Sequence, residues 1–132
     1  MASIRREIAL EQTADRVWEA LRDFHAVDRR VAPGFVTRSE PDGTGRIITF
    51  ANGTTAREEL VDCDNSGRRL VYAISNERLK HYSAAMQVFA DGPAHCRLVW
   101  TVDLLPNELA NYIGQQMDAA VNVMKPTLER TG

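Results

Sequence analysis

Glu58 carries the most informative polar side chain in the sequence. The strand-like segment around it alternates so that Ala56, Glu58 and Leu60 share one face. If Leu60 faces the interior, Glu58 faces it too. A carboxylate in an apolar pocket has a raised pKa and can orient or deprotonate a ligand, so Glu58 is a candidate catalytic acid or base. The alternative is a strand-end carboxylate that lies in water or pairs with Arg57 or Arg78.

Phenols and an amide form a second group of candidate site residues. Tyr72 and Tyr82 lie on neighbouring strand-like segments, and Tyr112 and Gln116 lie on one helical stripe. A buried phenol needs a hydrogen-bond partner, and this much polarity is unusual in a dry core. We therefore interpret these residues as pocket lining. Met86 is of a type that commonly fills cores but also suits a pocket that adapts to different apolar ligands.

The sequence carries no other recognisable reaction motif. Cys63, Cys96 and the three histidines lack the spacing of metal ligands, and there is no glycine-rich phosphate loop or nucleophile elbow. We expect two reduced thiols, no metal and no cofactor.

Composition narrows the class of protein further. The chain has 132 residues, of which 44% are hydrophobic and 26% charged, as in one soluble globular domain spanning residues 1–132. A formal charge of −2 gives no basic footprint for nucleic acid. There is no apolar stretch of membrane-span length and no secretory apolar core at the N-terminus. We expect a cytoplasmic monomer or homodimer.

The order of the expected elements is one strand, two short helices, six strands and one long helix. The first strand covers residues 3–11 and the short helices residues 14–21 and 24–31. The long helix follows Pro106, and Pro126 should kink or fray its end. Tight turns join the remaining strands into an antiparallel meander; these strands are expected at 34–40, 45–51, 54–62, 69–75, 82–90 and 96–104.

This order predicts an α+β fold with a hollow. One face of a seven-stranded antiparallel sheet is far wider than a single helix, so the sheet should curl around the long C-terminal helix. A curled sheet that grips a helix leaves space between them. An apolar space with a few polar groups is typical of small-molecule sites.

The chain resembles the START-like, pollen-allergen-like helix-grip superfamily (SRPBCC), and within it the bacterial polyketide cyclase/dehydrase and lipid-transport branch. The similar segments are residues 14–24, 34–35, 45–48, 57–60, 64–74, Tyr82 and 96–100. The resemblance covers nearly the whole chain and implies the helix-grip fold. It implies function less directly, because one scaffold has many uses.

A narrower resemblance concerns residues 76–82, which are similar to the latch of plant abscisic acid receptors. The receptor gate Ser-Gly-Leu-Pro is replaced here by Ala-Asn-Gly-Thr at 51–54, and Thr37 stands where the receptors have a carboxylate-binding lysine. Hormone reception is therefore not implied. The family pocket positions correspond here to Thr37, Ile48, Phe50, Glu58, Tyr72, Ile74, Arg78, Leu79, Tyr82, Ala84, Tyr112, Gln116 and Ala120. Leu60 and Met86 complete the expected lining.

Three hypotheses for function follow. The first is binding or transport of a small hydrophobic or aromatic molecule in the cavity. The second is an enzyme like a polyketide cyclase, dehydratase or isomerase, in which Glu58 acts with Tyr72 or Tyr82. The third is an interaction or stress-type protein in which the cavity is incidental.

Overall fold

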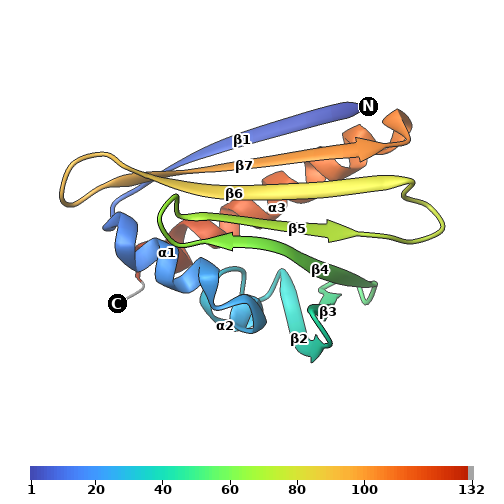
Figure 1. Cartoon of the computed structure of the whole chain (residues 1–132), viewed down its shortest axis with the longest axis horizontal. Coiled ribbons are helices and arrows are strands. Elements are labelled where there is room, and N and C mark those ends of the chain that lie inside the picture. The colour runs from blue at the N-terminus through green and yellow to red at the C-terminus, as the bar shows by residue number, and fades with distance from the viewer. Residues whose placement is uncertain (131–132) are drawn as a thin grey trace.

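The computed structural model describes residues 1–130, which form a curled antiparallel sheet with a long helix lying across one face (Figure 1). The α+β helix-grip architecture expected from the sequence is confirmed. The elements in chain order are β1 (Ala2–Leu10), α1 (Ala14–Arg22), η1 (Phe24–Ala26), α2 (Val27–Arg30), β2 (Val36–Asp42), β3 (Gly45–Phe50), β4 (Thr55–Asp64), β5 (Arg69–Ile74), β6 (His81–Ala90), β7 (Cys96–Leu105), η2 (Asn107–Leu109) and α3 (Ala110–Glu129).

The seven strands follow the order β1-β7-β6-β5-β4-β3-β2, and every neighbouring pair is antiparallel. Strands β2 to β7 are a meander, while β1 pairs with β7 at the opposite edge. The register shifts between Leu60 and Asp62 in β4, and again near the start of β2. Such irregularities bend strands, which fits the curl of this half of the sheet.

Helix α1 begins at an N-cap made by Thr13, whose hydroxyl accepts a hydrogen bond from the backbone N–H of Arg16 at 3.2 Å. Val17, Trp18 and Leu21 are buried, as their helical spacing predicts. The indole nitrogen of Trp18 donates to the Asn65 side chain at 3.1 Å. That contact fixes α1 against the turn between β4 and β5.

Helix α3 packs closely over its C-terminal half. Met117, Ala120, Met124 and Leu128 are buried in the core. Pro126, which we expected to kink or fray the end of this helix, lies inside α3, and the helix continues past it to Glu129. Buried residues on both sides of the proline hold the chain in place, which offsets the missing backbone N–H.

Towards the N-terminal end of α3 the packing loosens. Tyr112 is 47% exposed and Ile113 only half-buried, in contrast to the closely packed half of the helix. Polar contacts tie the middle of the helix to the first strand, since Arg6 Nε donates to Asp118 Oδ1 at 2.6 Å. The looser half of α3 is where the cavity lies.

Candidate functional site

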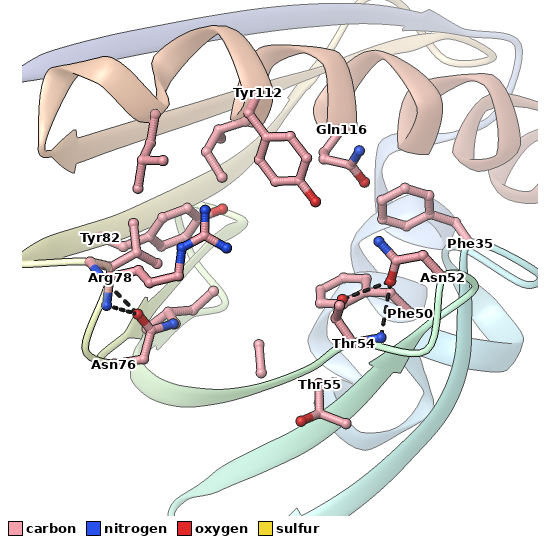
Figure 2. Close-up of a pocket in the computed structure, with 15 residues that line it drawn as sticks. Phe35, Phe50, Asn52, Thr54, Thr55, Asn76, Arg78, Tyr82, Tyr112 and Gln116 are labelled. Carbon is pink, nitrogen blue, oxygen red and sulfur yellow. Dashed lines mark hydrogen bonds between the residues drawn. The ribbon is translucent and has the colours of Figure 1, made fainter.

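A cavity of about 270 Å³ lies between the N-terminal half of α3 and one end of the meander, where its strands begin and finish (Figure 2). At this end of the sheet, β3 and β5 finish and β4 and β6 begin. Antiparallel hairpins bring these strand ends together, and the loops that follow them form the rim. The lining is mainly apolar, and its polar groups lie on the loops, on the first residues of β4 and β6, and on α3.

The structure brings together seven of the side chains expected from the sequence and places eight elsewhere. Those that line the cavity are Phe50, Ile74, Arg78, Leu79, Tyr82, Tyr112 and Gln116. Those outside its lining are Thr37, Ile48, Glu58, Leu60, Tyr72, Ala84, Met86 and Ala120.

The eight outside residues fall into three environments. Ile48, Glu58, Tyr72, Ala84, Met86 and Ala120 are buried in the packed interior. Thr37 is exposed on β2, where its hydroxyl donates to the Thr49 carbonyl at 3.2 Å. Leu60 is half-buried and borders a separate surface hollow beside Phe24. The prediction placed the hollow too deep, because side chains of the α3 stripe fill the space beneath it.

Eight lining residues were missed from the sequence: Phe35, Asn52, Thr54, Thr55, Ala56, Asn76, Leu109 and Ile113. Leu109 and Ile113 belong to the apolar stripe of α3, and Ala56 shares the inward face of β4, so periodicity could have found these three. The loop residues carry no comparable signal. Their place at the rim depends on how the β3–β4 and β5–β6 loops fold over the strand ends.

Asparagines hold both of these loops. Asn76 Oδ1 accepts hydrogen bonds from the backbone N–H groups of Arg78 and Leu79, both at 2.9 Å. On the opposite rim, Asn52 Oδ1 accepts from the backbone N–H of Thr54 at 3.0 Å and from its hydroxyl at 2.7 Å. Figure 2 shows both sets of bonds. Such turns fix short segments without regular secondary structure.

Glu58 lies inward of the cavity and is only 5% exposed. The predicted strand phase is confirmed, but the carboxylate pairs with neither Arg57 nor Arg78. Its partner is Arg46, directly opposite on β3, whose Nε and Nη2 both donate to Glu58 Oε1, at 2.8 and 2.5 Å. Burial raises the pKa of Glu58, and the charge and hydrogen bonds of Arg46 offset part of that increase.

Arg46 itself is enclosed on several sides. It is 5% exposed, and its Nη1 donates to the backbone carbonyl of Phe24. The guanidinium lies 3.8 Å from the centroid of the Phe24 ring and 5.5 Å from that of Tyr72. These contacts satisfy a buried cation. They also connect β3 and β4 to η1.

The buried phenols differ in their access to the cavity. Burial raises the pKa of Tyr72, and nearby Tyr82 and Glu58 raise it further. Burial also raises the pKa of Tyr82, with a smaller contribution from Glu58. Both hydroxyls therefore stay protonated at neutral pH and can donate hydrogen bonds. Tyr82 lines the cavity, whereas Tyr72 lies outside its lining.

Among residues 1–130, no group of three or more histidine, cysteine or acidic side chains is arranged to hold a metal ion. Cys63 is exposed and Cys96 is buried, and both are free thiols. None of the helices in the described part of the chain is long and apolar enough to cross a membrane.

Fold and cavity together define a helix-grip protein with room for a small molecule. The family model for polyketide cyclase / dehydrase and lipid transport matches residues 1–131. The chain belongs to that family. No curated protein matches it.

Solved structures share the fold. An uncharacterized protein from Bacillus thuringiensis has a TM-score of 0.84 at 16% identity, covering 96% of this chain and 98% of that one. A protein from Thermobifida fusca reaches 0.79 at 29% identity, covering 98% and 95%. The di-domain ARO/CYC BexL of the BE-7585A biosynthetic pathway reaches 0.82 at 15% identity, covering 98% of this chain and 47% of BexL. A START superfamily protein from Mycobacterium smegmatis is also similar, with 0.72 at 9% identity, covering 96% and 94%.

Proposed function

We propose that the protein binds a small hydrophobic or aromatic molecule in the cavity beneath α3, to hold or carry it. The observation that supports this most directly is the cavity itself, about 270 Å³ in volume and bordered by side chains from four strands and a helix. Ligand sites in proteins are usually concave, mainly apolar and provided with a few polar groups that fix orientation.

The apolar part of the lining suits a flat ligand. The rings of Phe35 and Phe50 pack edge to face, with centroids 5.7 Å apart. Ile74 and Leu79 come from the sheet side, and Ile113 comes from α3. A planar body placed among these groups would be removed from water on most sides, and that burial would supply most of the binding free energy.

The enzymatic alternative has less support from the geometry. The oxygen of Glu58 that meets Arg46 already accepts two hydrogen bonds, and Glu58 is not part of the cavity lining. Tyr72 is likewise outside the lining, and the raised pKa of Tyr82 suits a hydrogen-bond donor rather than a base. A general base must reach the proton that it removes. The arrangement therefore favours binding over acid–base catalysis by Glu58.

The test is titration with N-phenylnaphthylamine, an uncharged dye whose fluorescence rises in apolar surroundings. The wild-type protein should give a saturable signal with one site per chain. Ala56→Phe should weaken or abolish it, because Ala56 lines the cavity and the added ring occupies the space. Circular dichroism should show that the variant keeps its fold.

Ala73→Phe is the matched control. Ala73 lies on the adjacent strand β5 and alternates with Tyr72 and Ile74, which are buried, so it faces the opposite side of the sheet. The same substitution there should leave dye binding unchanged. Absence of saturable binding by the wild type, or equal binding by the Ala56→Phe variant, would show that the cavity is not a ligand site.

A further inference from the structure

Arg78 is the one charged side chain among the residues that line the cavity, and no aspartate or glutamate lines it. Within residues 1–130, its guanidinium takes part in no ion pair or side-chain hydrogen bond. Arg46, Arg57 and Arg68, by contrast, each meet a carboxylate. The cavity thus holds a positive charge that the protein does not neutralise.

The local structure presents this charge to the cavity. Two hydrogen bonds from Asn76 fix the backbone of Arg78 and Leu79. Leu79 packs against the core, which anchors the segment from the inside. Figure 2 shows the Arg78 guanidinium directed across the mouth between Tyr82 and Tyr112. The position of the cation is therefore set by the loop and not by a competing carboxylate.

The two asparagines, one on each rim, add donors rather than acceptors. Two N–H donors bind Asn76 Oδ1, which assigns the oxygen to that position and leaves the Nδ2 group as the free end. Asn52 Oδ1 is likewise occupied by Thr54, so its Nδ2 group is the end left for a ligand. The protonated hydroxyl of Tyr82 can donate as well. The polar groups of the cavity thus favour a ligand group that accepts hydrogen bonds.

Resting on the proposed function, we infer that the bound molecule is an amphiphilic anion: an apolar or aromatic body that carries an anionic oxygen group, such as a carboxylate, which Arg78 binds at the mouth of the cavity. The apolar walls hold the body of the ligand. The guanidinium offers paired N–H donors whose geometry matches a carboxylate or a related oxyanion. An uncharged molecule of the same shape would leave this cation without a partner.

Matched dyes test the inference. Anilinonaphthalene sulfonate and N-phenylnaphthylamine share one aromatic body and differ in the anionic group. The wild type should bind the sulfonate more tightly. Arg78→Gln should weaken sulfonate binding by about fivefold, since the charge lies near solvent, and should leave the uncharged dye unchanged. Arg78→Lys should restore part of the preference. Competition by naphthaleneacetate and not by naphthaleneacetamide would extend the result to a carboxylate.

Arg29→Gln controls for general attraction of the sulfonate to surface charge, because Arg29 is exposed on α2 and does not line the cavity. This variant should bind both dyes like the wild type. If Arg78→Gln leaves sulfonate binding unchanged, or weakens both dyes equally, anion recognition by Arg78 is wrong while the cavity remains a ligand site. If neither dye binds saturably to the wild type, the proposed function fails and this inference fails with it.

Discussion

Glu58 and Arg46 face each other across β3 and β4, and both are withdrawn from water. Strand alternation was sufficient to predict that Glu58 points inward. Its partner was harder to predict, because an arginine on an alternating strand usually reaches solvent. The pairing depends on the β3–β4 register and on η1, whose Phe24 carbonyl and ring complete the site for the guanidinium. Both features depend on the tertiary structure, and no local sequence pattern predicts them.

Loss of either member of this pair should have unequal effects on stability. Glu58→Gln should change the free energy of unfolding by no more than about 1 kcal/mol, because the lost ion pair is offset by the removed desolvation penalty. Arg46 would keep the Phe24 carbonyl and an amide oxygen as acceptors. Arg46→Met should cost about 3–5 kcal/mol, because it leaves a buried carboxylate without its cation. Urea denaturation at neutral pH measures both.

Two further variants make this comparison decisive. Arg46→Met combined with Glu58→Gln should be more stable than Arg46→Met alone, because no uncompensated charge remains. Arg38→Met removes an arginine from an exposed pair with Glu40 and should cause no measurable loss. Equal destabilisation by Glu58→Gln and Arg46→Met would contradict the expected asymmetry.

The raised pKa of Glu58 also predicts the sign of a pH dependence. The folded protein keeps the Glu58 proton to a higher pH than the unfolded chain does, so the folded state binds more protons between the two pKa values. As the pH rises from about 4.3, the ordinary glutamate value, the contribution of Glu58 to stability should fall. Urea denaturation of the wild type and of Glu58→Gln at a series of pH values isolates this contribution. A wild type that gains stability over the variant as the pH rises would show a lowered pKa instead.

Among the elements, the connection between β5 and β6 contributes Asn76, Arg78 and Leu79 to the cavity lining. Asn76→Ala should release the backbone of Arg78 and weaken binding of anilinonaphthalene sulfonate several-fold, towards the affinity of Arg78→Gln. The free energy of unfolding should change little, because Asn76 is exposed. Fluorescence titration and urea denaturation of the same samples test both statements.

Ser75→Ala serves as the neighbouring control, since Ser75 is exposed and does not line the cavity. It should leave the affinity for the sulfonate unchanged. If Asn76→Ala binds the dye like the wild type, the two backbone bonds do not position Arg78. If both variants weaken binding equally, the effect belongs to the loop in general and not to the asparagine.

Element boundaries were largely predictable, because the signals that mark them come from residues close together in the sequence. Alternation and turn residues placed most strand boundaries within about two residues of those observed, because both signals come from neighbouring side chains. The extent of α3 was less predictable. Pro126 is a helix-breaking residue by its local chemistry, yet the core contacts of Met124 and Leu128 hold the helix together. Packing of this kind overrides local preference.

For the molecule as a whole, the class of fold followed from the order of the elements, while the depth of the cavity did not. A wide sheet against a single helix predicts a hollow somewhere along their contact. Where it opens depends on how closely α3 packs against the sheet: Met117 and Met124 are buried at one end of the helix, while Tyr112 is exposed and Ile113 half-buried at the other. That outcome is a property of the assembled core, which explains why only part of the expected lining surrounds the cavity.

The pairing of β1 with β7 also affects the order in which parts of the protein can fold during synthesis. Ala2–Leu10 leaves the ribosome well before its partner Cys96–Leu105, because most of the domain lies between the two strands in the sequence. Until then the first strand has an unsatisfied backbone edge, which other chains could recruit. Pairing of such distant segments slows folding, because a long loop must close, with a loss of chain entropy, before any stabilising contact forms. Helix α3 emerges after β7, so a nascent chain can bind no ligand beneath this helix until Ala110–Glu129 has left the ribosome.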